Sequence, residues 1–214
     1  MDPKKPSKPT RAARLAPEER RSQLLACAIR AFADTGLGRA THAEVARLAE
    51  VSVPTVFVYY PTRETLVDAV LDEVERFVID ETLAPVQTLP RPVPELLIES
   101  GLAFTEAVRT HPDHARVWLD WSTAFRRDVW PRYLAFQSRV EQLFKDMMLR
   151  GKRDGSLARR LDVDDAAQLL VGTGHMLAQI DHFMRTLIDG FRGNDGAAVP
   201  RGKIRRKPGS RKPA

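Results

Sequence analysis

The chain has 214 residues, of which 43% are hydrophobic and 29% are charged. This balance is typical of a folded globular protein, and it excludes a chain that is disordered throughout. The length allows either a small module joined to a second domain or a single larger domain with its own core.

The net charge of +6 is concentrated at the two ends of the chain. Residues 1–14 hold five basic residues against the acidic Asp2, and residues 199–214 hold seven basic residues and no acidic one. The ends together therefore carry +11, which leaves about −5 for residues 15–198. We expect residues 1–16 to be a disordered basic arm and residues 193–214 a disordered basic tail, both suited to a polyanionic partner.

Cysteine usage and hydropathy indicate the compartment. Cys27 is the single cysteine, so no intrachain disulfide can form. Its place in an apolar helical pattern favours a small core residue over a redox sensor. The sequence has no run of about 18 apolar residues and no signal-type segment, which favours a cytoplasmic protein without a membrane partner.

Helical periodicity recurs along the chain and strand-like alternation is almost absent, so the predicted fold class is all-α. The first helix is expected to begin at Pro17 and to end at Gly36. The second is expected to begin after Thr41, whose hydroxyl can cap it while Glu44 bonds back to the Thr41 amide in a capping box.

Two more helices are predicted before the first long loop. Ser52 is expected to cap a short third helix that stops before Pro61. Thr62 is expected to cap a fourth helix that reaches about Thr82 and links two domains, which cover residues 17–62 and 63–192.

The second domain is predicted to be a bundle of long helices. Four prolines, at positions 85, 90, 92 and 94, indicate a loop. Helical patterns follow over residues 95–109, from Pro112, over residues 128–150 and over residues 164–188, and glycines at 151 and 155 are expected to end the third of these. The last pattern is too broadly apolar for a solvated helix and needs a partner surface.

The short second and third helices, residues 41–50 and 52–60, are separated by a tight turn and preceded by a supporting helix. This spacing matches a helix-turn-helix, in which the second of the two helices enters the DNA major groove. Spacing alone is a weak signal, because ordinary corners between two helices share it.

Residues 49–66, AEVSVPTVFVYYPTRETL, resemble the signature of TetR family transcriptional regulators. Gly38-Arg39, His42-Ala43, Thr55-Val56-Phe57 and Pro61 to Glu64 are most similar to the LuxR/HapR/SmcR subgroup of quorum-sensing master regulators. The resemblance continues into Trp118 to Ser122 and Asp128 to Pro131, beyond the DNA-binding module. It implies a DNA-binding module followed by a C-terminal helical domain that binds a ligand and dimerises.

The resemblance also implies a set of DNA contacts. Recognition-helix side chains and Arg63 would contact phosphates or the groove, and the basic arm would enter the minor groove. The expected DNA-binding residues are Arg11, Arg14, Arg39, Thr41, Ser52, Val53, Pro54, Thr55, Val58, Tyr59, Thr62 and Arg63.

Three positions depart from the family pattern. Val58 stands where a polar base reader is common, Pro54 replaces a small residue and removes an amide, and Glu50 stands where many members have glycine. Residues 15–68 hold six basic and seven acidic residues, so the module has little positive charge of its own. The ends of the chain are therefore expected to supply much of the attraction to DNA.

The C-terminal helices are expected to enclose a small apolar ligand, because they carry aromatic residues and methionines. For any single one of these residues, ordinary core packing is the competing interpretation. The expected ligand-binding residues, named mainly by analogy with the subgroup, are Phe77, Trp118, Trp121, Gln137, Glu141 and Met176.

Other functions find little support in the sequence. His111 with His114 and His175 with His182 have ligand-like spacing, but no cysteine or carboxylate completes a metal set, so no metal or other cofactor is expected. No nucleophile with a base and no paired carboxylates indicate an enzyme. The alternative kept open is an architectural protein that binds DNA nonspecifically through its basic ends.

A short recognition helix reads only a few base pairs, so a homodimer on a palindromic operator is expected. Residues 164–188, with part of residues 128–150, are the expected interface. A ligand held by the C-terminal helices is expected to shift the helix over residues 62–82 and so to change the spacing of the two recognition helices.

Overall fold

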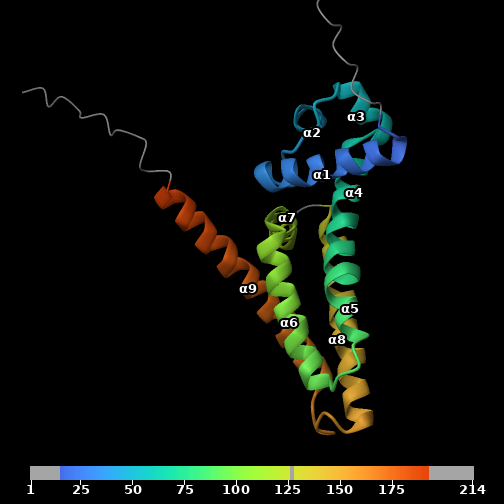
Figure 1. Cartoon of the computed structure of the whole chain (residues 1–214), viewed down its shortest axis with the longest axis vertical. Coiled ribbons are helices and arrows are strands. Elements are labelled where there is room, and N and C mark those ends of the chain that lie inside the picture. Colours follow the sequence, from blue (N-terminus) through green and yellow to red (C-terminus); the bar gives the residue numbers. More distant parts are fainter. Residues whose placement is uncertain (1–14, 126–127, 193–214) are drawn as a thin grey trace, which may run out of the picture.

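The computed structural model describes residues 15–125 and 128–192, with side chains described up to residue 188. Every regular element within these residues is helical, which confirms the all-α prediction. Three N-terminal helices lie across one end of a long bundle made by the later helices (Figure 1). Arg11, Arg14 and the expected tail over residues 193–214 lie outside the described residues.

The three N-terminal helices are α1 (Pro17–Thr35), α2 (His42–Leu48) and α3 (Val53–Tyr59). The predicted capping box opens α2: the Thr41 amide donates to Glu44 Oε2 at 2.8 Å, and the Glu44 amide donates to Thr41 Oγ1 at 3.3 Å. Gly36 follows α1 with a φ of 82°, in the left-handed region that favours glycine. The starts of α1 and α2 and the end of α1 therefore agree with the sequence prediction.

The turn between α2 and α3 depends on a left-handed backbone at Glu50, where φ is 54°. The Val51 amide closes the turn by donating to the Ala46 carbonyl at 3.0 Å. A residue with a Cβ costs about 1 kcal/mol more than glycine in this conformation. The turn is therefore tight although the sequence lacks the glycine that would suit it best.

α4 (Arg63–Arg76) continues without a break into a π-helical segment, η1 (Phe77–Leu83), and a final turn, α5 (Ala84–Gln87). Thr62 caps α4 as predicted, because its hydroxyl accepts from the Thr65 amide at 3.2 Å. The predicted start of the loop at Pro85 is wrong. Pro85 lies in the first turn of α5, where a missing amide is tolerated and the π-helical turn has already changed the hydrogen-bond register.

The remaining helices are α6 (Val93–Thr110), α7 (Pro112–Ser122), α8 (Trp130–Asp154) and α9 (Val163–Arg192). The prediction that Gly151 helps to end the third of these is wrong, because α8 passes through it and ends before Gly155, whose φ is 83°. A Cβ on Gly151 would lie 2.9 Å from side-chain atoms of Leu157 and Val93. Gly151 therefore serves close packing and not helix termination.

Ion pairs fasten α4 along α8. Glu75 is only 8% exposed, and it accepts from Arg132 Nε at 3.3 Å and from the Arg139 guanidinium. Arg132 also bonds Asp68 at 3.2 Å and pairs with Asp72. Because α4 begins directly after α3, this clamp ties the N-terminal helices to the bundle.

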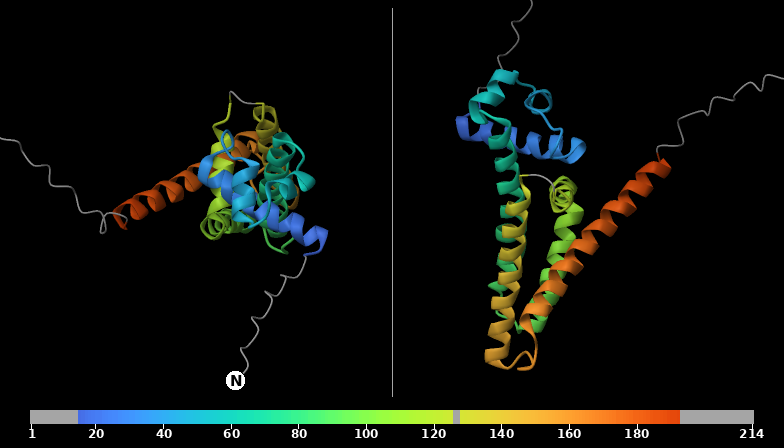
Figure 2. Two further views of the ribbon diagram at one scale, coloured as in Figure 1. Left: turned by 90° about the horizontal axis from the view of Figure 1, so that it is seen from above. Right: turned by 180° about the vertical axis from the view of Figure 1, so that it is seen from behind.

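α9 leaves the rest of the bundle along its C-terminal half, in both the front view (Figure 1) and the rear view (Figure 2). Its large apolar side chains stay exposed there: Phe183 is 61% exposed, Ile180 52% and Met184 48%. No helix within the described residues is long and apolar enough to cross a membrane. The broad apolar pattern predicted for this helix is thus present, and no other described part of the chain covers it.

Cys27 is half-buried on α1, and burial raises the pKa of its thiol. A raised pKa lowers the fraction of reactive thiolate at neutral pH. This environment supports the interpretation of Cys27 as a packing residue.

Candidate DNA-binding and ligand-binding sites

α3 presents an exposed apolar face on one side and is anchored on the other. Val58 is 77% exposed and Phe57 45%, whereas Val56 is completely buried against the core. An isolated exposed valine is common, but three apolar side chains on a short helix, with Val53 at 36%, form a face that a partner can cover. This is the helix that the sequence assigns to the major groove.

His42 fixes the orientation of α3. Its imidazole is 8% exposed, Nε2 lies 2.8 Å from the Tyr60 carbonyl, and the ring stacks on Phe57 with centroids 4.1 Å apart. The interactions join the start of α2 to the middle and end of α3. His42 was not predicted to act near the site, because its contacts span 15 and 18 residues of sequence.

The hydroxyl of Ser52 does not cap α3 as predicted. Ser52 occupies the N-cap position, but Oγ lies 2.8 Å from Thr55 Oγ1 and makes no capping bond to a backbone amide. The nearby threonine hydroxyl competes for the same short side chain. Two hydroxyls therefore lie together at the start of α3.

Five of the predicted DNA-binding residues border one shallow surface hollow, together with the start of α1. They are Ser52, Pro54, Thr55, Val58 and Tyr59. Arg20 lines the same hollow, and its guanidinium donates to Gln23 Oε1 at 2.6 Å. Sequence reasoning missed Arg20, because only the folded chain brings α1 beside α3.

Four other predicted DNA-binding residues have local partners elsewhere. Arg39 Nε donates to the Thr35 carbonyl at 3.1 Å, and the Arg63 guanidinium donates to the Leu37 carbonyl. Thr41 and Thr62 cap α2 and α4. Both arginines are exposed, and both hold the loop between α1 and α2.

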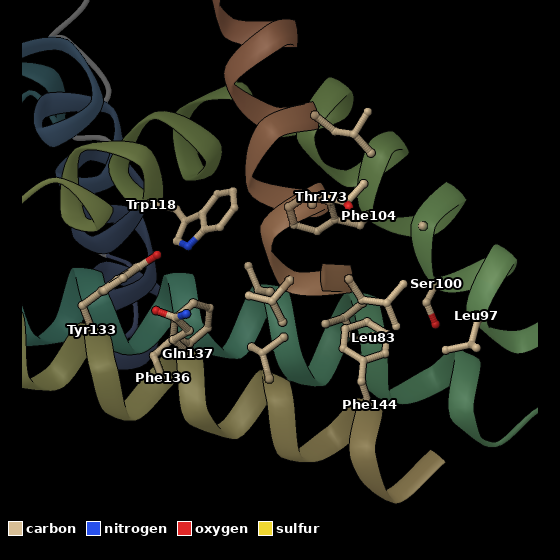
Figure 3. A pocket seen from close by; sticks show the side chains of 17 residues that line it. Leu83, Leu97, Ser100, Phe104, Trp118, Tyr133, Phe136, Gln137, Phe144 and Thr173 are labelled. Carbon is tan, nitrogen blue, oxygen red and sulfur yellow. The ribbon is translucent and has the colours of Figure 1, made fainter. Parts of the chain in front are cut away.

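A second site is an apolar cavity between η1 and the helices α6 to α9 (Figure 3). Its volume is about 110 Å³, counted as space open to the centre of a water molecule, and it is partly enclosed. Trp118 and Gln137, both predicted from the sequence, line it with Phe104, Tyr133 and Phe136. Aromatic and aliphatic walls with a few polar groups are typical of small-molecule sites.

The other predicted ligand-binding residues do not line this cavity. Phe77 packs between the rings of His111 and His114, with centroids 4.7 and 4.6 Å away. Trp121 is completely buried beside the cavity wall, and its Nε1 donates to the Val129 carbonyl at 3.0 Å.

Glu141 and Met176 are also outside the cavity. Glu141 Oε1 accepts from Gln137 Nε2 at 3.2 Å, so it orients a lining residue from behind. Met176 is 52% exposed on the outer face of α9. Helical periodicity places Met176 on an apolar face, but it does not decide whether that face turns toward the chain's own bundle.

One hydrogen bond joins the bundle to the N-terminal helices near this cavity. Asp120 on α7 accepts from the Leu37 amide at 2.6 Å, and a Cβ on Gly36 would lie 3.3 Å from the same carboxylate. Asp120 is two residues from the cavity residue Trp118. The loop that precedes α2 is therefore held between Asp120 of the bundle and Arg63 of α4.

The histidine pairs do not form a metal site in the part of the chain that the structure describes. His111 and His114 both pack on Phe77, and burial lowers the pKa of His114. His175 lies edge-on to Trp118 with centroids 5.1 Å apart, and burial lowers its pKa as well. Packing against aromatic rings therefore explains the placement of His111, His114 and His175.

Comparison with known proteins agrees with this geometry. A family model described as bacterial regulatory proteins of the tetR family matches residues 24–70, which span most of α1, α2, α3 and the first half of α4. The HTH-type transcriptional regulator LuxR of Vibrio harveyi is 34% identical over 159 residues, covering 74% of this chain and 77% of LuxR.

Solved structures share the fold of most of the chain. The crystal structure of a TetR-like transcriptional regulator from Rhodococcus sp. RHA1 matches with a TM-score of 0.67 and 23% identity, covering 86% of this chain and all of that one. The regulator FadR of Bacillus subtilis in complex with stearoyl-CoA matches with a TM-score of 0.64 and 15% identity, covering 81% of this chain and 90% of FadR.

Proposed function

Because this chain belongs to the TetR family of bacterial DNA-binding transcriptional regulators, we propose that it acts as a homodimer on a palindromic operator and responds to a small apolar ligand. One observation carries the proposal: a helix-turn-helix with an exposed recognition helix is hydrogen-bonded, through Leu37 and Asp120, to a bundle that encloses an apolar cavity. Both components of a ligand-responsive regulator are thus present in one chain.

We propose that α3 enters the major groove with its exposed face against the bases. Val53, Pro54 and Val58 would contact base edges, while the hydroxyls of Thr55 and Tyr59 would bind phosphate oxygens. A valine contacts thymine methyl groups by apolar packing, so the operator would carry a thymine opposite Val58.

Cationic and capping residues would surround this helix on the DNA backbone. We propose phosphate contacts for the exposed Arg39 and Arg63, and minor-groove contacts for Arg11 and Arg14 in the arm before α1. Thr41, Ser52 and Thr62 would hold the helix starts against the phosphates. Arg20, beside α3, joins this set.

The exposed face of α9 supports a dimer. Its apolar residues recur at helical spacing along one side: Leu169, Met176, Ile180, Phe183 and Leu187. A large unpaired apolar stripe on one helix is characteristic of a helix-to-helix interface. Two copies pairing through α9 would place two recognition helices on one operator with two-fold symmetry.

Ligand control would pass through the loop before α2. A ligand against Trp118 would move α7, and Asp120 on the same helix would transfer that motion to Leu37. FadR of B. subtilis, which shares the fold, was solved in complex with stearoyl-CoA, a ligand with a long apolar acyl chain, and this supports a ligand with an apolar part.

Selection of binding sites from random DNA tests the proposal. A palindromic consensus with a discrete footprint, bound by two chains, is the expected result. Uniform protection of all sequences would instead support the architectural alternative, in which the basic ends bind DNA nonspecifically. The mass of the protein–operator complex shows whether the footprint comes from two chains or from one.

The resemblance to quorum-sensing regulators extends the proposal to genes that respond to cell density. Transcript profiles of the wild type and a deletion strain, each at low and high density, test it. We expect operator-linked genes to differ between the strains at only one of the two densities. Equal differences at both densities would remove the link to quorum sensing and leave the regulator proposal intact.

A further inference from the structure

The cavity in the bundle holds a hydrogen-bond donor that nothing in the described chain satisfies. Trp118 is 6% exposed and lines the cavity, and its Nε1 has no hydrogen-bond partner among the described residues. A buried donor without a partner costs about 1–3 kcal/mol, so its retention calls for an explanation.

Three other polar side chains of the cavity, those of Ser100, Thr173 and Gln137, already donate to acceptors within the chain. Ser100 and Thr173 donate their hydroxyls to helix carbonyls at 2.8 and 2.7 Å, and Gln137 donates to Glu141 at 3.2 Å. Trp118 Nε1, in contrast, has no acceptor among the described residues, so it is available to a guest. Figure 3 shows its indole nitrogen facing the same end of the cavity as the Tyr133 hydroxyl and the Gln137 amide.

The cavity offers nothing to a charged guest. None of the described residues that line it has an acidic or basic side chain, and Leu83, Leu97 and Phe144 line the end away from Trp118 (Figure 3). Burial raises the pKa of Tyr133 and lowers that of the adjacent His175, so both stay neutral at pH 7. An ion placed here would lose its hydration without a counter-charge.

We propose that the effector is an uncharged, mainly apolar molecule with a carbonyl-type oxygen that accepts from Trp118 Nε1. This assignment rests on the proposed function and narrows its ligand to one chemical class. The cavity volume of about 110 Å³ is near the ~150 Å³ of an apolar cavity that admits benzene, so the buried part is about one ring in size. The phosphates of an acyl-CoA would find no cation in this cavity.

Three probes of nearly equal shape test the class: acetophenone, α-methylstyrene and benzoate. They present a carbonyl, a methylene and a carboxylate at the same position of the same ring. Binding to the full-length ¹⁵N-labelled protein is followed on the three tryptophan indole N–H signals. We expect acetophenone to shift the Trp118 signal downfield and to bind about three- to tenfold more tightly than α-methylstyrene, and benzoate to bind most weakly.

Two variants assign the effect to one side chain. Trp118→Phe removes the donor and keeps an apolar ring, so the preference for acetophenone over α-methylstyrene should disappear. Trp130→Phe removes an indole that does not line the cavity, and it should leave the preference unchanged. If Trp118→Phe does not fold, the ratio of the wild-type affinities for acetophenone and α-methylstyrene still tests the proposed ligand class.

Equal affinities for acetophenone and α-methylstyrene, tighter binding of benzoate, or no binding of acetophenone would each overturn the assignment. Each sample is also titrated with the selected operator. Intact operator binding alongside any of these results overturns the ligand class alone. Absence of a discrete operator overturns the proposed function, whatever the probes show.

Discussion

Val58 is the most exposed apolar side chain of the recognition helix, at 77%, and it occupies a position where the family pattern often has a polar base reader. Its methyl groups can contact a thymine methyl but donate no hydrogen bond. Replacing Val58 should therefore alter which base is preferred more than it alters folding. A substitution at Val58 can therefore test base recognition in DNA without changing the stability of the protein.

We predict that Val58→Asn shifts the selected base from thymine toward adenine at one position in each half-site, because asparagine can pair with adenine in the major groove. Repeated site selection with the variant measures the shift. The free energy of unfolding, measured by thermal denaturation, should change by less than about 0.5 kcal/mol, since the side chain is exposed. An unaltered consensus would place Val58 away from the bases.

Asp120 makes the hydrogen bond of 2.6 Å that connects the bundle to the Leu37 amide. Asp120→Ala leaves this amide without its charged acceptor, and we expect a loss of about 1–3 kcal/mol in the free energy of unfolding. Urea unfolding measures it. The ligand should also change the operator affinity of this variant less than it changes that of the wild type.

Asp113→Ala is the matched control on the same helix. Asp113 pairs with Arg116 at 3.4 Å near the surface, so its loss should cost less than about 1 kcal/mol and leave the ligand response unchanged. Equal effects of the two substitutions would show that Asp120 has no special part in coupling.

Residue-scale prediction succeeded where the partners are close in sequence. The caps at Thr41 and Thr62 were predicted because their partners lie three residues away. The bond from Leu37 to Asp120 joins residues 83 apart, and no local pattern announces it. Ser52 failed for a local reason, since the Thr55 hydroxyl satisfies it in place of a backbone amide.

At the scale of elements, helix existence was predictable and helix continuity was not. Apolar periodicity locates every long helix, but the proline cluster from Pro85 predicts a loop that begins too early. Pro85 continues the helical path after η1, and Gly151 lies within α8 to admit Leu157. The first departure depends on the π-helical segment before α5, and the second on close packing by Leu157 and Val93; composition alone reveals neither.

The cavity shows the same limit of sequence reasoning. Two of the predicted ligand-binding residues, Trp118 and Gln137, line it, but Met176 does not, because α9 has one apolar side toward the bundle and another toward solvent. Periodicity identifies both sides as apolar. Only packing against α6 and α8 decides which side closes the cavity.

The outer side of α9 leads to a prediction for this element. Ile180→Glu together with Phe183→Glu places two charges on the exposed apolar face, and we expect the dimer to dissociate to single chains. Light scattering after gel filtration measures the mass. His182→Glu adds a charge to the same helix outside this face, and it should leave the dimer intact.

Operator affinity should fall with the dimer in the double variant, since one recognition helix alone reads half of the site. Circular dichroism of the variant separates dissociation from unfolding: the helical signal should persist because both side chains are already exposed in one chain. A variant that stays dimeric would move the interface away from α9.

At the scale of the whole molecule, charge and shape are divided between different parts of the chain. Residues 15–68 supply the exposed recognition helix but hold six basic residues against seven acidic ones. The twelve basic residues of residues 1–14 and 199–214 lie outside that module. Base reading and phosphate attraction would therefore depend on separate segments.

Removal of residues 1–14 and 199–214 should weaken operator binding and flatten its dependence on salt. The slope of log K against log salt is negative, and each lost phosphate contact reduces its magnitude by about 0.9. Binding is measured at several salt concentrations for the full chain, for each single truncation and for both together. Because Val58 and Thr55 are retained, the selected consensus should not change.

The single truncations distinguish the two ends. An arm that enters the minor groove should contribute both to the slope and to base preference beside the half-sites, whereas a nonspecific tail should contribute to the slope alone. A tail that only improves solubility would leave the slope unchanged when residues 199–214 are removed. An unchanged slope after both truncations would show that the helical module attracts DNA without the basic ends, and Arg20, Arg39 and Arg63 would then carry the phosphate contacts.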